Sequence, residues 1–176
     1  MEQILKEERF NIISKENKIF IEEFTKQMET IGYGIGDSIG DGFCWGHYMI
    51  IYSQNNVKAK KIIARIYIRD KGIRIWGGKN HKWDNEIVLR LFFTNIDKHM
   101  NYIETAPSHI KLPFINNEKL CKKCEEKQCH NKKIYTVNGK IIEKCGYVFE
   151  FKNPKVENVM DYIDILKEFY VNKKKK

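Results

Sequence analysis

The chain has 176 residues, a formal net charge of +9, 42% hydrophobic residues and 12% aromatic residues. This composition is typical of a globular protein and excludes a disordered chain. No apolar run is long enough to span a bilayer, and the charged N-terminal segment lacks the apolar region of a signal peptide. We therefore expect a cytoplasmic protein that does not act on a membrane, with an anionic partner as the natural complement of its charge.

The first third of the chain is predicted to pass from helices to strands. Residues 3–13 are expected to form a short helix, and Ser14 is a candidate N-cap for a longer helix that ends at Gly32. A glycine-rich segment then leads into a predicted strand over residues 43–52.

The middle of the chain alternates between polar and apolar residues. Residues 60–69 predict a strand, and Asp70-Lys71-Gly72 would turn it back into a second strand over 73–76 as a hairpin. Residues 77–85 are expected to form a polar loop before a strand over 87–94.

The last third begins with predicted helical turns near Ile96 and Pro107. Asn138-Gly139, between two alternating apolar runs, is the strongest short hairpin signal in the chain. A strand over 147–151 and an amphipathic helix after Pro154 complete the pattern.

Hairpins dominate over strand–helix–strand crossovers in this order of elements. We therefore expect an α+β fold, with a largely antiparallel sheet built of hairpins and helices packed mainly on one face. No interior linker is evident, so we expect a single domain over residues 1–172, with the cysteine-rich loop and hairpin of 115–151 inside it. The lysines at 173–176 are expected to form a disordered tail.

Four of the five cysteines have a spacing that suits a metal site: Cys121, Cys124, Cys129 and Cys145. A two-residue turn at Asn138-Gly139 would place Cys145 opposite Lys132, at the open end of the hairpin beside Cys129. Four converging thiolates make a closed tetrahedral site, so we predict a structural zinc ion. His130 competes with Cys129 for one ligand position, and the alternative is a loop of reduced, unconnected thiols.

A second candidate site lies on the predicted strand of residues 60–69. Alternation places Arg65, Tyr67 and Arg69 on one face, and Arg90 is expected in the same sheet. If helices cover the other face, these side chains would form a surface for a small anionic ligand or a protein segment. The alternative is a solvated strand face. The predicted ligand-binding residues are Arg65, Tyr67, Arg69, Arg90, Trp45 and His47.

Three classes of function remain open from the residues. We favour a zinc-stabilised binding protein for an anionic ligand or a protein partner, without catalytic residues. A nucleic-acid-associated or regulatory accessory protein, with the lysine tail and the basic cysteine loop contacting phosphates, is the first alternative. The second is a hydrolase that uses Ser38, from the match of residues 36–40 to G-x-S-x-G, or a thiol-redox enzyme that uses Cys44 or the Cys121-x-x-Cys124 pair. The sequence does not fix an oligomeric state.

Three segments resemble a family of small, uncharacterised α+β proteins from low-GC bacteria. They are residues 42–52, residues 89–107 and the C-x2-C-x4-C…C block with its Asn-Gly hairpin. The resemblance implies a shared fold and the metal block. It implies no activity and no catalytic residue.

Overall fold

The structure is a computed structural model that describes residues 1–35, 39–54, 61–116 and 129–171. Its chain packs as two compact units. Unit 1 comprises residues 1–91 and 150–163, and unit 2 comprises residues 92–149 and 164–176. The expectation of a single domain over 1–172 stays a prediction, and the lysine tail lies outside the described residues.

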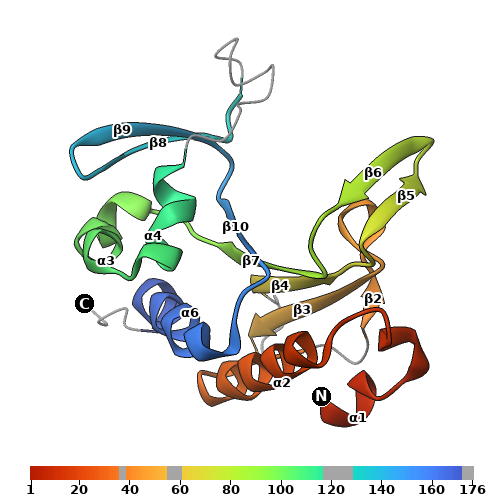
Figure 1. The fold of residues 1–176 in the computed structure, drawn as a ribbon. Coiled ribbons are helices and arrows are strands. Elements are labelled where there is room, and N and C mark those ends of the chain that lie inside the picture. The colour runs from red at the N-terminus through yellow and green to blue at the C-terminus, as the bar shows by residue number, and fades with distance from the viewer. Residues whose placement is uncertain (36–38, 55–60, 117–128, 172–176) are drawn as a thin grey trace. The chain divides into compact units, whose positions relative to one another are not determined.

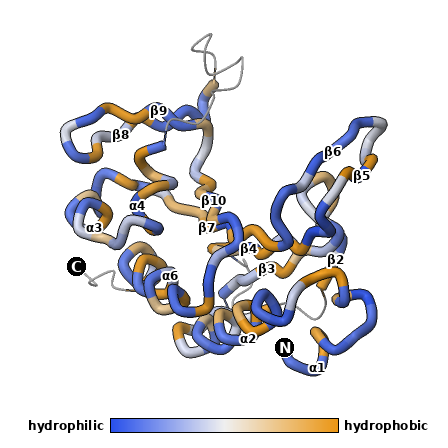
Figure 2. Tube along the Cα trace, viewed as in Figure 1, coloured by the Kyte–Doolittle hydropathy of each residue, from blue (hydrophilic) through white to orange (hydrophobic). Residues whose placement is uncertain are grey.

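The sheet of unit 1 has the strand order β1–β3–β4–β7–β10, with β2 also paired to β3. The pairs β1–β3, β2–β3, β3–β4 and β4–β7 are all antiparallel, which confirms the predicted α+β class with a mostly antiparallel sheet. The sheet strands are β1 (Tyr33–Ile35), β2 (Gly40–Asp41), β3 (Tyr48–Gln54), β4 (Ile62–Ile68), β7 (Ile87–Phe92) and β10 (Val148–Lys152). Hydrophobic residues are concentrated along β4 and β7 (Figure 2), which are the central strands of this order.

Helix α2 (Lys15–Thr30) packs on one face of this sheet (Figure 1). The Ser14 hydroxyl accepts a hydrogen bond from the Asn17 N–H at 3.4 Å, which confirms the predicted N-cap. The Phe24 ring lies edge-on to Tyr52 of β3 with ring centroids 5.2 Å apart. The Thr25 hydroxyl bonds the buried Tyr52 hydroxyl at 2.8 Å, so the one polar atom of Tyr52's ring is satisfied in the core.

Two predictions for unit 1 are wrong in their details. Residues 3–13 form a short helix, α1 (Glu2–Leu5), followed by a 3₁₀ turn at Glu8–Phe10. The strand predicted over 43–52 begins only at Tyr48, because residues Phe43–Trp45 form another 3₁₀ turn.

The predicted pairing of β5 is also wrong. Strand β5 (Gly72–Trp76) pairs with β6 (Lys79–Trp83) and not with β4, and β6 occupies the predicted polar loop. Gly77 and Gly78 both have positive φ, 58° and 72°, as a two-residue type I′ turn requires. The hairpin extends away from the main sheet (Figure 1). The alternation of polar and apolar residues did not predict β6. Both faces of this hairpin are partly exposed, so polar residues occur on both faces of the strand.

Unit 2 contains helices α3 (Met100–Thr105) and α4 (Ser108–Ile115) and the hairpin of β8 (Lys132–Val137) and β9 (Lys140–Cys145). Its core is a group of phenylalanine rings. Phe114 stacks on Phe149 with centroids 4.2 Å apart, and Phe93 lies 4.3 Å from Phe169. The predicted C-terminal helix is present as a 3₁₀ turn, α6 (Val159–Leu166) and a π-helical turn at Lys167–Val171.

The Asn138-Gly139 hairpin is confirmed in detail. The two turn residues have φ values of 49° and 73°, which are typical of a type I′ turn. The register pairs Val137 with Lys140 and Lys132 with Cys145, as the sequence predicts.

Glu86 joins the start of α2 to the strand region of unit 1. Its carboxylate accepts hydrogen bonds from the Ser14 N–H at 2.9 Å and the Asn17 side chain at 2.6 Å. Lys71 lies 3.3 Å away. Burial alone would raise the pKa of Glu86, but these hydrogen bonds lower it to about 2.

The depressed pKa of Glu86 gives a pH-dependent contribution to stability. The charged carboxylate stabilises the folded state above the ordinary pKa of 4.5, and this contribution is lost as the pH falls toward about 2. We therefore expect Glu86→Gln to lower the free energy of unfolding by about 1–3 kcal/mol at pH 7. The difference from the wild type should shrink between pH 4.5 and pH 2 in urea titrations.

Glu8→Gln is the matched control, because Glu8 is exposed and its side chain forms no hydrogen bond or ion pair with the described residues. It should change the free energy of unfolding by less than about 0.5 kcal/mol. A Glu86→Gln protein as stable as wild type at pH 7 would contradict the role of this carboxylate.

Candidate functional site

The candidate site of unit 1 lies on the sheet face opposite the side chain of Tyr52. Antiparallel pairing places Arg65 of β4 directly opposite Arg90 of β7, and Tyr67 opposite Met49 of β3. Arg65 and Tyr67 alternate with Ala64 and Ile66, so they share one face. We call Arg65, Arg69 and Arg90, together with Trp45 and Tyr67, the arginine cluster.

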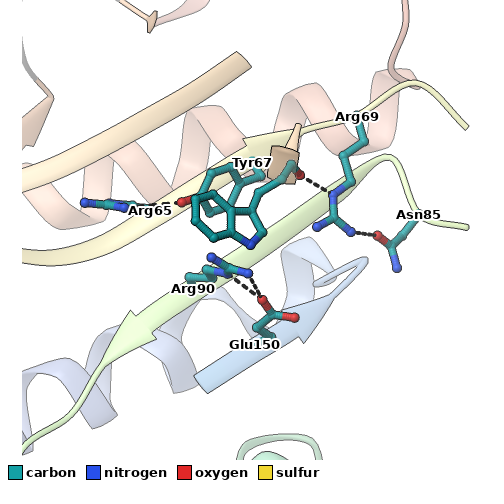
Figure 3. A network of polar contacts seen from close by, with 7 residues as sticks. Arg65, Tyr67, Arg69, Asn85, Arg90 and Glu150 are labelled. Atoms are coloured by element: carbon teal, nitrogen blue, oxygen red, sulfur yellow. Dashed lines mark hydrogen bonds and ion pairs between the residues drawn. The ribbon is translucent and has the colours of Figure 1, made fainter. Parts of the chain in front are cut away.

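Arg90 is the centre of the arginine cluster (Figure 3). Its guanidinium carbon lies 4.9 Å from the Trp45 ring centroid and 4.8 Å from that of Tyr67. The same guanidinium forms an ion pair with Glu150 of β10. The Arg90 side chain is only 14% exposed, so both the ring contacts and the ion pair act in a partly desolvated environment. Each such cation–π contact contributes roughly 0.5–2 kcal/mol.

Arg69, just after β4, is bound by neutral acceptors. Its Nε donates to the Trp45 carbonyl and its Nη1 to the Asn85 side-chain oxygen, both at 2.6 Å (Figure 3). The residue is 8% exposed. Burial lowers the pKa of Arg69, and the charge of Arg90 lowers it further, although an arginine remains charged at neutral pH.

Arg65 and Tyr67 complete the cluster on β4. The Arg65 Nη1 donates to the Tyr67 hydroxyl at 3.3 Å (Figure 3). Tyr67 is fully buried and Arg65 is partly exposed. Arg65 is therefore partly open to solvent. Tyr67 contacts the guanidinium groups of both Arg65 and Arg90.

The turn of residues 42–47, which we call the aromatic turn, carries Trp45 to the sheet face. Arg74 of β5 donates to the carbonyls of Phe43, at 3.2 Å, and of Gly46. The His47 N–H donates to the Ile68 carbonyl at 2.8 Å. A Cβ on Gly46 would lie 2.7 Å from the Ile68 carbonyl oxygen, so only glycine permits this close approach of the turn to β4.

His47 is half-buried and packs edge-on to Trp83, with centroids 5.5 Å apart. Burial lowers the pKa of His47, and the positive charge of Arg74 lowers it further. His47 is therefore neutral at pH 7 and adds no positive charge to this region.

The structure thus places all six predicted ligand-binding residues in unit 1, and it joins Trp45, Tyr67 and Arg90 by direct contact. Whether they bind a ligand stays a prediction. Sequence reasoning missed the partners that fix the arginines, Glu150 and Asn85. The alternation of residues 147–151 could have placed Glu150 on the arginine face, but nothing local identifies Asn85.

The predicted zinc ligands are described only in part. Cys121 and Cys124 lie outside the described residues. The Cys129 carbonyl accepts a hydrogen bond from the Lys132 N–H at 3.2 Å, and Lys132 is the cross-strand partner of Cys145. Among the residues that the structure describes, no group of three or more metal-binding side chains is close enough to hold an ion, so the zinc-type loop is not shown.

Of the residues predicted for the enzyme alternative, the structure describes only Cys44. Ser38 lies outside the described residues. Cys44 is partly exposed in the aromatic turn. Within the described part of the chain, no helix has the length and hydrophobicity needed to cross a membrane.

Comparisons with known proteins do not assign this chain to a family. No family model matches it, and neither the curated proteins nor the solved structures include a match. The resemblance to small low-GC bacterial proteins therefore stays an expectation.

The close approach at Gly46 predicts that the aromatic turn cannot accept a side chain there. Gly46→Ala would place a Cβ 2.7 Å from the Ile68 carbonyl and 3.3 Å from the Tyr67 Cβ. We expect a loss of about 1–3 kcal/mol in the free energy of unfolding and a changed near-ultraviolet circular dichroism spectrum, because Trp45 must shift.

Gly40→Ala is the control, since no atom lies within 4 Å of a Cβ built at Gly40. Its unfolding free energy should stay within about 0.5 kcal/mol of the wild-type value. Equal behaviour of the two variants would show that the aromatic turn is not held against β4.

Proposed function

We propose that this protein is a binding protein whose arginine cluster takes a small anionic ligand. The observation that carries the proposal is the register of the sheet, which sets Arg65 directly opposite Arg90. Like charges directly opposite on neighbouring strands are destabilising. Glu150 offsets part of the charge of Arg90, and a bound anion beside the two arginines would add charge-assisted contacts.

The surroundings of the pair support the same conclusion. Arg69 adds a third guanidinium, and it is bound by neutral groups, the Trp45 carbonyl and the Asn85 side chain. Glu150 is the carboxylate that contacts Arg90. Three guanidinium groups beside this one carboxylate leave an excess of positive charge, which favours an anion.

The residues of the cluster divide into two roles. Trp45 is 41% exposed and Arg65 is partly exposed, so these two form the accessible rim of the site. Tyr67 and Arg69 are buried and act through the groups that they position. Arg90 contacts a member of each group, because its guanidinium lies over the rings of Trp45 and Tyr67.

The proposal includes a structural zinc ion in unit 2, held by Cys121, Cys124, Cys129 and Cys145. Support comes from the C-x2-C-x4-C spacing and from the register that sets Cys145 opposite Lys132. The Cys129 backbone bonds to the same lysine. The hairpin therefore brings the chain at Cys129 and the chain at Cys145, two of the four proposed ligands, to its open end.

The anion site is tested by calorimetric titration of the full chain with inorganic pyrophosphate. We expect binding to the wild type, and a loss of about ten-fold or more in affinity for Arg65→Gln, because a charge-assisted hydrogen bond contributes roughly 1.5–3 kcal/mol. Arg65→Gln keeps a polar side chain on the strand and removes one member of the like-charge pair. Because Arg65→Gln also removes the hydrogen bond to the Tyr67 hydroxyl, the free energy of unfolding is measured alongside, and affinity is compared only under conditions where both proteins are folded.

Lys26→Gln is the control for net charge. Lys26 is exposed on α2, so the same change in net charge occurs away from the arginine cluster. Its affinity for pyrophosphate should match the wild type. If pyrophosphate does not bind, or if the two variants bind equally well, the proposed site is wrong.

The zinc proposal is tested by native mass spectrometry of the purified chain. We expect one zinc ion per chain, loss of the ion and of thermal stability with a chelator, and reduced zinc content in Cys145→Ser. Cys44→Ser, which changes a cysteine of unit 1, should retain the metal. A wild-type chain that carries no zinc after purification in zinc-containing medium would contradict this part of the proposal.

A further inference from the structure

Two exposed aromatic rings from distant parts of the sequence meet beside the arginine cluster. Phe43 of the aromatic turn is 46% exposed and Trp76 at the end of β5 is 41% exposed. Their ring centroids are 6.3 Å apart and the rings are nearly perpendicular, at 78°. Trp45, two residues from Phe43, is also 41% exposed. We call Phe43, Trp45 and Trp76 the aromatic strip.

The backbone of Phe43 is strained to present its ring. Its φ is +53°, a left-handed conformation that is costly for a bulky side chain. The conformation is held by Asp41, whose side chain accepts the Phe43 N–H at 2.8 Å, and by Arg74, which donates to the Phe43 carbonyl. Because the ring stays nearly half exposed, core packing does not account for the strain. Strain of this kind is typical of binding sites.

Positive side chains accompany the aromatic strip. Lys79 is the cross-strand partner of Trp76, and Arg74 of the same hairpin is partly exposed. Within the described part of the chain, Lys79 forms no ion pair. Arg74 lies 3.6 Å from Asp41, whose side chain is 55% exposed, so this pair is weak. Exposed rings beside cations are the two elements of a surface that stacks bases and follows a phosphate backbone.

We infer that the aromatic strip and the β5–β6 hairpin bind single-stranded nucleic acid. Unpaired bases would stack on Phe43 and Trp76, and phosphates would lie near Lys79, Arg74 and the arginine cluster. The inference rests on the proposed anion-binding function and names the class of ligand. A single strand is favoured over a duplex because its bases are free to stack on protein rings.

The aromatic strip is tested by fluorescence anisotropy of a labelled twelve-nucleotide thymidine strand, dT12, with the full chain. We expect binding that weakens as salt rises. Trp76→Ala should lower the affinity about ten-fold. Lys79→Gln should reduce the slope of log affinity against log salt by about 0.7, as expected for one phosphate contact on a single strand.

Phe43→Gly separates a binding role from a structural one. Glycine adopts positive φ without cost, so the melting temperature should stay the same or rise, while the affinity for dT12 should fall about ten-fold. Ile73→Ala is the matched control. Ile73 is 68% exposed on the same hairpin, and its pairing with Lys82 in the register sets it on the face opposite Arg74. Its affinity for dT12 should be unchanged.

Three outcomes overturn the inference. The first is pyrophosphate binding without dT12 binding, which leaves the proposed anion site intact. The second is dT12 binding that Phe43→Gly and Trp76→Ala do not weaken. The third is dT12 binding that Ile73→Ala weakens as much as Trp76→Ala, which would indicate general contact with the hairpin. Failure of pyrophosphate to bind would overturn the proposed anion site itself, whether or not dT12 binds.

Discussion

The stacking of Arg90 between Trp45 and Tyr67 is the interaction on which the candidate site depends. It joins three separate parts of unit 1, because Trp45 belongs to the aromatic turn, Tyr67 to β4 and Arg90 to β7. The ion pair with Glu150 adds β10 to the same group. Removal of Arg90 would leave the half-buried Glu150 carboxylate without this ion pair and Trp45 without its cation contact, so the guanidinium acts as the structural centre of this sheet face.

The opposite face of the same sheet is stabilised by a different kind of contact. There, the rings of α2 pack on Tyr52, and apolar burial supplies the free energy. This division lets unit 1 carry charged groups on one face without weakening its core. The arginine face sets Arg65 opposite Arg90, and the contacts of Arg90 with Glu150 and of Arg65 with the Tyr67 hydroxyl offset the repulsion between the two guanidinium groups.

The aromatic turn connects this sheet face to the β5–β6 hairpin. Its conformation depends on the absence of a side chain at Gly46, on the carbonyl contacts of Arg74, and on the strained backbone of Phe43. These constraints fix the backbone conformation of the aromatic turn, and with it the positions from which Phe43 and Trp45 extend.

The sequence by itself determined the elements whose information is local. The cap at Ser14, the Asn138-Gly139 turn and the shared face of Arg65 and Tyr67 follow from residue type and alternation over a few positions, and the structure confirms them. Only the tertiary structure decided the partner of β5, the strained turn at Phe43 and the contact of Arg90 with Glu150. These features join residues up to sixty positions apart, and the free energy of such contacts depends on the geometry of the whole sheet rather than on any local pattern.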